Sequence, residues 1–560
     1  MKSDQCSTRN GGKILVDALV SHGVSHLFCV PGESYLPVLD ALLDQDSIQT
    51  VVCRQEGGAA MMADAYGKLA DKPGVCFVTR GPGAANAASG LHVAQQDSTP
   101  LILFIGQVEQ SMAGREAFQE IDFKLMFGSI AKLVEQIDDP KRIPEIVSRA
   151  FHIAVNGRPG PVVITLPEDM LLASAKVEDV EAYRKTESSI GNYEINSLDL
   201  LLSNAKRPLV ISGGRSWSKG ARKAFHKFAS NWNLPITAAF RYQDCFDNSN
   251  NHYVGDIGIG INPNLKSAIL NADLLIVFCV RLGEITTSGY TLISVPKPKQ
   301  LLIHVYPGVE ELGRVYRPTL AINAGPNRLF KALGKIEPSF EPPWNKWRQD
   351  LRASYIDWSK PKPQPGSVQL GSIIEAICDE VPRDTIITNG AGNYTGWLHR
   401  YYKYRDSGTQ LGPTSGSMGY GLPAAIAAKL LNPSRTVVAF AGDGCFLMTS
   451  QELATAVQYD LAIVIVVVNN GMYGTIRMHQ ERLYPGRVSG TDLLNPDFFT
   501  YARAFGAHAE KVYQTKDFLP AFKRAISQNR PSLIEIIADP EVISPHGTVK
   551  DLQTPNGIAN

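Results

Sequence analysis

A Gly-Asp-Gly turn and an Asn-Asn pair carry the strongest chemical signal in this chain. The apolar run Thr436–Gly442 ends at Asp443, and a second apolar run, Ile463–Val468, ends at the pair Asn469–Asn470. If both runs are parallel strands of one βαβ unit, their carboxyl ends lie at the same edge of a sheet. Asp443 and Asn470, which are 27 positions apart, can then converge on one point. A carboxylate and an amide oxygen beside glycine-flanked backbone amides suit Mg²⁺ that carries a diphosphate.

A doubly wound sheet with ordinary polar turns is the alternative explanation of this segment. The Gly-Asp-Gly turn on its own would fit that alternative. The Asn-Asn pair at this distance favours a cofactor anchor, and the pattern is not that of a hydrolase nucleophile.

Glu56 is the second candidate for chemistry. It follows a strand-like segment, SIQTVVCR, and opens a helix of small residues that includes Ala59–Ala70. A carboxyl group in such a place is a candidate for proton transfer. The alternative is a solvated glutamate at a helix start, where the helix dipole favours acids.

Bulk composition indicates a globular protein of several domains. At 560 residues the chain is too long for a single core and predicts about three to four domains. Hydrophobic content of 44% and charged content of 19% are typical of a soluble globular protein. The net charge of +1, from 55 basic and 54 acidic residues, gives no electrostatic basis for binding nucleic acid or a membrane surface.

The cysteines and the N-terminus indicate a cytoplasmic location. None of the eight cysteines forms a CxxC pair, and several lie in apolar strand-like runs such as VCFV and IVFCV. They are typical of buried thiols in a reducing compartment, not of a disulfide or zinc framework. The first residues, MKSDQCSTRNGGK, lack the apolar core of a signal peptide, and no apolar run approaches the length of a membrane span.

Strand and helix patterns alternate from end to end, which predicts an α/β fold of parallel layers. Changes in composition divide the chain into three doubly wound parallel-sheet domains and a polar tail, namely residues 10–175, 190–340, 365–540 and 541–560. The segments between them are charged or rich in Pro and Lys, which is typical of linkers. The first and third domains are candidates for related sheets.

The Gly-Asp-Gly turn, its spacer and the Asn-Asn pair resemble the metal-diphosphate signature of the thiamine diphosphate enzymes. The segments RQEGGAAMMADAYGKL, GVCFVTRGPGAAN and GQVEQSMAGREAFQEID resemble, in the same order, those of the acetolactate synthase (acetohydroxyacid synthase) large-subunit group. The resemblance covers nearly the whole chain. It implies that residues 10–175 bind the aminopyrimidine, that residues 365–540 bind the diphosphate, and that residues 190–340 form a variable central domain.

The resemblance also assigns roles to individual residues. It implies that Asp443, the Asn470 side chain and the Met472 carbonyl hold Mg²⁺. Glu56 would activate the ring of the cofactor, and Phe118 and Gln119 would lie beside substrate, with Lys132 near the entrance. The other cofactor contacts that it implies are Pro31, Gly32, Gly83, Asn86, Gly392, Asn393, Tyr394, Gly416, Met418, Gly444, Cys445, Tyr473 and Gly474.

The chain departs from this group mainly around the substrate pocket. His479 stands where biosynthetic members carry a tryptophan that helps to select a larger second keto acid, and a histidine is smaller and can transfer protons. Gln55 replaces a common histidine, His92 replaces a small residue, and Glu33–Ser34 occupies a turn that is usually Gly-Gly. We therefore expect the cofactor to be shared with the group while the substrate can differ, with His479 as a catalytic candidate beside Glu56 and Gln119.

The central domain leaves the binding of FAD open. Flavin-containing relatives show Gly-Met-His-Gly and an Arg-Phe-Asp-Asp-Arg run. The matching places here are Gly258–Ile261 and Arg281–Ile285, so the flavin contacts are only partly present. Ser212–Gly214, after a strand, is a candidate for a phosphate-binding turn.

The function that the sequence favours is decarboxylation of a 2-keto acid such as pyruvate, followed by ligation to a second carbonyl, with thiamine diphosphate and Mg²⁺. One alternative is a 2-keto acid decarboxylase or 2-hydroxy ketone lyase, in which no keto acid serves as acceptor. Another is a cofactor-binding relative without turnover, against which the intact Glu56, Asp443 and Asn470 argue. Glyoxylate carboligase is disfavoured because that group lacks the carboxyl of Glu56. By resemblance, the partners would be further copies of the chain, as a dimer or tetramer.

Overall fold

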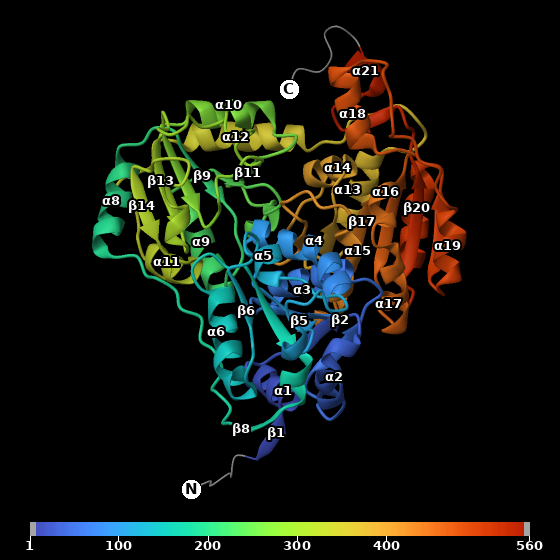
Figure 1. Cartoon of the computed structure of the whole chain (residues 1–560). Coiled ribbons are helices and arrows are strands. Elements are labelled where there is room, and N and C mark those ends of the chain that lie inside the picture. Colours follow the sequence, from blue (N-terminus) through green and yellow to red (C-terminus); the bar gives the residue numbers. More distant parts are fainter. Residues whose placement is uncertain (1–6, 554–560) are drawn as a thin grey trace. The chain divides into compact units, whose positions relative to one another are not determined.

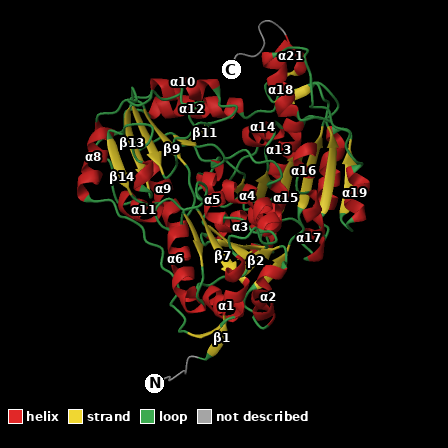
Figure 2. Ribbon diagram, in the orientation of Figure 1, coloured by secondary structure: helices red, strands yellow, loops and turns green. Residues whose placement is uncertain are grey.

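Three parallel sheets, each flanked by helices, form the framework of the protein. The computed structural model describes residues 7–553, and each of the three sheets in this range has six strands (Figures 1 and 2). The α/β fold with three doubly wound sheets predicted from the sequence is confirmed. Within the described range the chain divides into two compact units. One contains residues up to Thr186 together with Pro413–Asn432 and Thr449–Tyr459, and the other contains the rest.

The first sheet belongs to the first unit and has the order β3-β2-β4-β5-β7-β6, with every neighbouring pair parallel. Its strands are β2 (His26–Cys29), β3 (Gln49–Val52), β4 (Gly74–Val78), β5 (Leu101–Gln107), β6 (Leu133–Gln136) and β7 (Pro161–Pro167). The central strands are buried along their whole length. Helices on both faces exclude water, which explains why these strands appear in the sequence as continuous apolar runs.

Different helices cover the two faces of the first sheet (Figure 1). Residues of α1 (Gly11–Ser21), α2 (Leu36–Leu43) and α6 (Ile143–Val155) share one apolar cluster with the strands. On the other face α3 (Glu56–Ala70) packs against α4 (Gly81–Asp97). This pair approaches closely, because a Cβ on Gly90 would lie 2.5 Å from the Cβ of Ala60. The remaining elements of this part are β1 (Thr8–Asn10), α5 (Phe123–Phe127), α7 (Glu168–Leu172) and β8 (Ser174–Lys176).

A buried ionic cluster fastens one later segment of the chain onto α3 and α4. This segment carries α15 (Gly421–Leu431), which packs on α3, and the first unit also contains α17 (Leu453–Gln458). Lys68 Nζ lies 2.7 Å from Asp64 Oδ2 and also pairs with Asp97, and all three side chains are buried. Tyr420 Oη donates to Asp64 at 2.6 Å, and the backbone N–H of Thr414 donates to Asp97 at 2.8 Å. The cluster therefore joins segments that are more than 300 positions apart in the sequence.

The central sheet belongs to the second unit and has the order β11-β10-β9-β12-β13-β14. Its strands are β9 (Pro208–Ser212), β10 (Ile236–Ala238), β11 (Tyr253–Asp256), β12 (Leu274–Phe278), β13 (Leu301–Tyr306) and β14 (Leu320–Asn323). One face packs against α8 (Asn192–Ser203), α9 (Lys219–Asn231) and α11 (Pro326–Leu333). The other face packs against α10 (Pro263–Asn271) and α12 (Asn345–Trp358).

The third sheet also lies in the second unit and has the order β16-β15-β17-β18-β20-β19. Its strands are β15 (Ile386–Asn389), β16 (Gln410–Leu411), β17 (Val437–Gly442), β18 (Val464–Asn469), β19 (His508–Val512) and β20 (Ser532–Ile537). The helices of this region are α13 (Leu370–Glu380), α14 (Tyr394–Tyr401), α16 (Asp443–Leu447), α18 (Gly474–Leu483), α19 (Phe498–Ala504) and α20 (Thr515–Ile526). The sequence prediction of parallel strands before Asp443 and Asn470 is confirmed, because β17 and β18 pair in parallel.

The polar tail begins with ordered structure. Its described part forms the hairpin β21 (Val542–Ser544) and β22 (Gly547–Thr548), followed by α21 (Val549–Gln553). Ile543, Val549 and Leu552 form a small apolar cluster with Met472. The end of the predicted tail, from residue 554, lies outside the described residues.

The first and third sheets share one strand order. Numbered within its own sheet, each runs 2-1-3-4-6-5, whereas the central sheet runs 3-2-1-4-5-6. In each sheet the later strands lie on both sides of the first strand, so the chain changes direction across the sheet beside it. Open α/β sheets bind ligands at such a switch point. The common order supports the idea that the first and third regions are related.

The cysteines between residues 7 and 553 are all free and buried, as the sequence predicts, whereas Cys6 lies outside that range. No helix in the same range is both long and apolar enough to cross a bilayer.

We expect Lys68→Met to destabilise the protein by about 3–5 kcal/mol, because it removes the cation that two buried carboxylates contact. Chemical denaturation followed by circular dichroism measures this change. Lys13→Met is the matched control, since Lys13 pairs with Asp17 at the same helical spacing on the surface. Its effect should stay below about 1 kcal/mol. Equal effects of the two substitutions would contradict the prediction.

Candidate functional site

The predicted polar residues follow the carboxyl ends of strands in the first and third sheets. Pro31–Gly32 follows β2, Glu56 follows β3 and Gly83 follows β4 in the first sheet. In the third sheet Gly392–Tyr394 follows β15, and Asp443 follows β17. Each set surrounds the switch point of its sheet, which is where the topology predicts a ligand.

Glu56, Gly83 and Asn86 come together in the first unit, and we call them the Glu56 cluster. Asn86 Nδ2, on α4, donates to Glu56 Oε2, at the start of α3, at 2.9 Å. A Cβ on Gly83 would lie 3.3 Å from Glu56 Oε1, so glycine leaves room for the carboxylate. Gln55 caps α3 by accepting a hydrogen bond from the N–H of Gly58 at 3.0 Å. The carboxylate of Glu56 is therefore held on a rigid helix start and remains half-buried.

The unusual pair Glu33–Ser34 is tied to the end of β4. Ser34 Oγ lies 2.9 Å from Thr79 Oγ1, and Arg80 Nη2 donates to Glu33 at 2.9 Å. Arg80 also donates to Glu168 at 2.6 Å, so one largely buried guanidinium contacts two carboxylates. Burial raises the pKa of Glu168, and the charge of Arg80 opposes that rise. These contacts fix the turn at Pro31–Gly32 against the strand that leads to Gly83.

Arg80 also holds the segment that contains Phe118 and Gln119. Its Nη1 donates to the carbonyl of Phe118 at 3.3 Å, and the N–H of Gly81 donates to the carbonyl of Gln119 at 2.9 Å. Gln119 has a φ of +65°, a region that non-glycine residues rarely adopt. The Phe118 side chain is 71% exposed, so it is available to a ligand or to another chain.

Gly416 and Met418 lie on a loop of the first unit. Gly416 is exposed with a φ of +71°, and a Cβ there would meet no atom within 4 Å. Met418 is half-buried, and Thr449 Oγ1 donates to the carbonyl of the next residue, Gly419, at 2.6 Å. The glycine is required by the backbone conformation and not by crowding.

Asp443 is the centre of the second cluster, in the second unit. Its side chain is buried, and Oδ1 accepts a hydrogen bond from the N–H of Gly444 at 2.8 Å. Oδ2 accepts from the N–H of Gly471 at 2.9 Å and from Asn495 Nδ2 at 2.8 Å. Burial raises the pKa of Asp443, and these neutral donors oppose the rise. Among residues 7–553 no basic side chain pairs with this carboxylate.

Asn470 lies in the loop that follows β18, between two residues that contact the surroundings of Asp443. Gly471 donates to Asp443 itself, and Asn469 Oδ1 accepts at 3.0 Å from Asn495, which also donates to Asp443. The Asn470 side chain lies near Gly474, where a Cβ would be 3.2 Å from Asn470 Nδ2. We call Asp443, Asn469, Asn470 and Asn495 the Asp443 cluster.

Asn495 and Glu535 are residues of this region that the sequence analysis missed. Asn495 comes from a loop 52 positions after Asp443, and Asn469 Nδ2 donates to the buried Glu535 at 2.8 Å. No periodic or glycine signal marks either residue. The only sequence signal for Glu535 is its charged side chain within the otherwise apolar run SLIEII, which forms β20.

The turn at Gly392–Tyr394 is fixed by its side chains. The N–H of Gly390 donates to Tyr394 Oη at 3.0 Å, and the same oxygen lies 3.4 Å from Cys445 Sγ. Asn393 Nδ2 donates to the carbonyl of Ile543 at 2.8 Å, so the tail hairpin contacts this turn.

The loop at residues 472–474 packs over the start of α16. A Cβ on Gly444 would lie 2.5 Å from the ring of Tyr473, which explains the second glycine of Gly-Asp-Gly. The Met472 carbonyl accepts from the N–H of Gly474 at 2.9 Å and keeps a second lone pair.

The remaining sequence candidates lie outside these clusters. His479 is exposed on α18, and His92 is exposed on α4. Lys132 Nζ donates to the carbonyls of Ile153 and Asn156 at the end of α6, which is a helix-capping role.

In the central sheet, protein groups surround the glycine turn after β9. A Cβ on Gly213 would lie 2.9 Å from Val280, and one on Gly214 would lie 2.1 Å from the carbonyl of Cys279. Trp217 Nε1 donates to the carbonyl of Gly213 at 3.1 Å. The two glycines are therefore explained by the close approach of the chain to itself.

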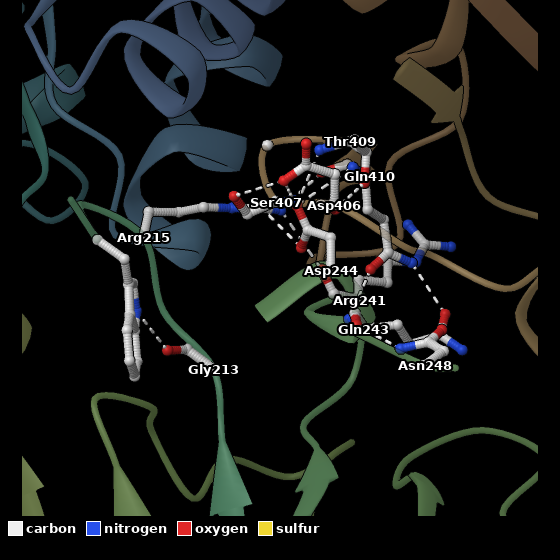
Figure 3. Close-up of polar contacts among 12 residues, drawn as sticks. Gly213, Arg215, Arg241, Gln243, Asp244, Asn248, Asp406, Ser407, Thr409 and Gln410 are labelled. Atoms are coloured by element: carbon white, nitrogen blue, oxygen red, sulfur yellow. Dashed lines mark hydrogen bonds and ion pairs between the residues drawn. The ribbon is translucent and has the colours of Figure 1, made fainter. Parts of the chain in front are cut away.

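Arg215, the next residue, links the central sheet to the third sheet (Figure 3). Its guanidinium pairs with Asp244 at 3.0 Å and donates to the carbonyl of Gln410, on β16, at 2.8 Å. Asp244 in turn accepts from the N–H groups of Thr409 and Gln410 at 3.0 and 3.2 Å. This turn thus serves packing between sheets of one unit.

Comparison with known proteins identifies the family to which the chain belongs. Residues 9–126 match the N-terminal TPP binding domain of the thiamine pyrophosphate enzymes, residues 195–333 match their central domain, and residues 390–536 match their C-terminal TPP binding domain. These matches together cover more than half of the chain, so the chain belongs to the thiamine pyrophosphate enzyme family.

Relatives resemble the chain over nearly its full length. It is 31% identical to the probable acetolactate synthase large subunit of Methanocaldococcus jannaschii, over 97% of this chain and 95% of that protein. It is 30% identical to the acetolactate synthase isozyme 2 large subunit of Escherichia coli, over 95% and 96% of the two chains. The acetolactate synthase large subunit of Lactococcus lactis is 31% identical over 94% and 92%. The protein is a thiamine pyrophosphate-dependent enzyme of the carboligase and decarboxylase class.

We expect Arg80→Ala to loosen the segment around Phe118 and Gln119, because the substitution removes a donor to the Phe118 carbonyl. Hydrogen–deuterium exchange of residues 113–121 should become about tenfold faster, which corresponds to the loss of one hydrogen bond to a charged donor. Glu33→Gly is the control, since it removes one carboxylate and leaves the guanidinium in place. Unchanged exchange in Arg80→Ala would contradict this role.

We expect Asn495→Ala to weaken metal-dependent cofactor binding about 10–100-fold, as loss of a residue that orients a metal ligand does elsewhere. Titration of thiamine diphosphate at varied Mg²⁺ concentration, followed by tryptophan fluorescence, measures the effect. Asp492→Asn, an exposed residue of the same loop, should bind as the unmodified protein does. Equal affinity of Asn495→Ala and the unmodified protein would show that Asn495 does not orient Asp443.

Proposed function

We propose that the protein is an acetolactate synthase-type carboligase, which decarboxylates pyruvate and joins the remaining two-carbon unit to a second 2-keto acid. The observation that carries the proposal is the pair of polar clusters at equivalent switch points of two sheets with one strand order. One cluster presents a carboxyl group for proton chemistry, and the other presents a buried carboxylate for a cation. The relatives described above are named acetolactate synthases, which supports the choice of reaction.

Mg²⁺ is part of the proposal, and the chemistry of the Asp443 cluster fits this ion. A buried carboxylate that has only neutral donors lacks the counter-charge that would stabilise it. Asp443, the Asn470 amide and the Met472 carbonyl would supply hard oxygen ligands, and Mg²⁺ with a diphosphate prefers such ligands.

The residues around the diphosphate would act by binding and orientation. Backbone N–H groups at the starts of α14 and α16 would bind the phosphate oxygens, because the N-terminus of a helix favours negative charge. The proposed contacts here are Gly392, Asn393, Tyr394, Gly444, Cys445, Tyr473 and Gly474.

Glu56 would supply the proton chemistry. When bound, thiamine diphosphate would supply a nucleophilic carbon and a sink for the electron pair that decarboxylation releases. Glu56 would hydrogen-bond or protonate the ring nitrogen of the pyrimidine, and Asn86 would hold the carboxyl group in its orientation by donating to Oε2. Gly83 would leave space for that contact, and Pro31, Gly32, Gly416 and Met418 would bound the ring.

The proposed reaction does not use FAD. The residues of the turn after β9 do not fit a flavin phosphate site, because Cys279, Val280 and Trp217 occupy its surroundings and Arg215 is paired with Asp244. The sequence matches to flavin contacts are also partial.

We further propose that the enzyme acts as a homodimer or a pair of dimers in the cytoplasm. The free buried thiols suit a reducing compartment. The exposed apolar side chains of Phe118, Leu125, Leu483 and Leu494 suit contact with a second copy of the chain. Sedimentation at assay concentration tests this state, and a fully active monomer would contradict it.

The reaction is tested by supplying purified protein with thiamine diphosphate, Mg²⁺ and a panel of 2-keto acids. The proposal expects CO₂ and acetolactate from pyruvate, identified by mass spectrometry. Acetaldehyde as the only organic product would favour a simple decarboxylase, and the absence of any turnover with every keto acid would favour a binding protein without catalysis.

We expect Glu56→Gln to keep the affinity for thiamine diphosphate while hydrogen–deuterium exchange at C2 slows about 10²–10⁴-fold, because an amide cannot protonate the ring as a carboxyl does. NMR of the quenched cofactor measures the exchange. Asn86→Ala, which leaves the carboxyl group but removes its donor, should slow the exchange less. An unchanged rate in Glu56→Gln would assign the activation to another residue.

We expect His479→Trp to shift the choice of second substrate toward 2-ketobutyrate over pyruvate. A flat apolar wall that contacts one more methylene is worth about 1–3 kcal/mol, and the exposed position of residue 479 on α18 gives the larger ring room. Competition between both keto acids measures the ratio, and cofactor affinity should stay constant. If the ratio does not change in a folded variant that binds cofactor, His479 does not border the acceptor pocket.

A further inference from the structure

Glu452 is a fully buried carboxylate that the proposed reaction does not use. It ends a short turn, Ser450–Glu452, directly before α17, and its side chain has no exposed surface. Its Oε1 accepts hydrogen bonds from the backbone N–H groups of Arg54 at 3.0 Å and Gln55 at 2.9 Å. Its Oε2 accepts from Thr455 Oγ1 at 2.6 Å. Both carboxylate oxygens therefore serve neighbours within the first unit.

The backbone that Glu452 holds is the last piece of chain before Glu56. Arg54 and Gln55 connect the end of β3 to the start of α3, and their N–H groups have no strand partner at this edge of the sheet. Since one oxygen accepts from two successive N–H groups, it fixes the direction of the chain as it enters the helix. The position of the Glu56 carboxyl follows directly from that direction.

The first turn of α3 is shaped around this side chain. A Cβ on Gly58 would lie 2.7 Å from Glu452 Oε1 and 2.9 Å from Cγ, so only glycine lets the helix approach so closely. Gly58 also donates to Gln55, which caps the helix. Glu452, Gln55 and Gly58 thus form one packed contact with little freedom to shift.

Other residues of the same segment hold the strand that precedes this turn. Tyr459 Oη accepts from the N–H of Val52 at 2.8 Å and donates to the carbonyl of Thr50 at 3.1 Å. Arg54 Nη2 donates to Gln458 at 2.6 Å. Tyr459 therefore offers a control contact that lies upstream of the turn and does not touch Arg54 or Gln55 through their N–H groups.

A buried carboxylate is a costly way to satisfy two amide groups, because desolvation of the charge opposes it. Burial raises the pKa of Glu452, and its hydrogen bonds together with the nearby charge of Arg54 oppose that rise. The bonds that it makes are short-range and directional, and such bonds fix geometry better than apolar packing does.

We infer that Glu452 is a positioning residue for Glu56: by accepting from the N–H groups of Arg54 and Gln55, it sets where the Glu56 carboxyl meets the cofactor. The inference rests on the proposed role of Glu56. What Glu452 contributes is the reach and acceptor ability of its Oε1, and not a proton or a charge at the reacting atoms.

Three substitutions of Glu452 separate the effect of its side-chain length from the effect of its charge. Glu452→Gln keeps the reach and an acceptor oxygen but removes the charge, and Thr455 can accept from the new amide. Glu452→Asp keeps the charge but is one methylene too short to reach both N–H groups. Glu452→Ala removes both. Tyr459→Phe is the matched control for loss of a hydrogen bond in the same segment.

The first readout is hydrogen–deuterium exchange of peptides that contain Arg54 and Gln55, which does not require activity. We expect protection to remain in Glu452→Gln and to fall at least about tenfold in Glu452→Asp and Glu452→Ala, as expected for loss of hydrogen bonds to a charged acceptor. Tyr459→Phe should keep it. Protection that remains in both Asp and Ala variants would overturn the inference.

The second readout is the C2 exchange rate of bound thiamine diphosphate at saturating cofactor. We expect Glu452→Gln to stay within about threefold of the unmodified protein, and Glu452→Asp to lose about tenfold or more, because a displacement of about 1 Å can cost up to 10²-fold. The reverse order, with the Asp variant fast and the Gln variant slow, would overturn the inference in favour of a charge or proton role. Absence of C2 exchange in the unmodified protein would refute the role of Glu56, whereas amide protection would still report on the contact of Glu452.

Discussion

Parallel pairing of the strands is the constraint on which the two polar clusters depend. In a parallel sheet every carboxyl end lies at the same edge, so residues that follow different strands meet without a special loop. Glu56 and Gly83 follow β3 and β4, while Asp443 and Asn470 follow β17 and β18. The helices that leave this edge add their N-terminal N–H groups to the same region. The chemistry of each cluster is therefore a product of sheet topology as much as of residue type.

The buried carboxylates of the protein are stabilised in different ways, and the difference indicates their use. Asp64 and Asp97 share a lysine, which offsets part of their charge, and they accept hydrogen bonds from a distant segment. Asp443 has only neutral donors, namely two backbone N–H groups and the Asn495 amide. Glu452 is fully buried, and both of its oxygens accept hydrogen bonds from neighbouring N–H and O–H groups. Glu56 is half-buried with one amide donor, and its carboxyl can still reach a ligand.

The sequence predicted the architecture well because its signals are local. Apolar runs, glycine turns and the distance between Asp443 and Asn470 each depend on one βαβ unit, and the strands before both residues are parallel neighbours. The contact of Glu56 with Asn86 was not predicted, because 30 positions and a whole strand separate the two residues.

Contacts made by distant, unpatterned residues could not be predicted. Glu452 meets Arg54 across 398 positions, and Asn495 meets Asp443 across 52. Neither residue has a period, a glycine or a cap that marks it. Arg80 gave no signal either, although Glu33, the residue that it pairs with, was recognised as unusual. The role of His479 stays a prediction, because exposure on α18 alone does not identify a pocket.

The common 2-1-3-4-6-5 order of the first and third sheets has a consequence for ancestry. Six strands can be arranged in many orders, so two independent origins are a poor explanation for one shared arrangement beside a central sheet that differs. Duplication of one gene segment accounts for it simply. On this account the two copies diverged at the same edge of the sheet, where one now carries Glu56 and the other carries Asp443.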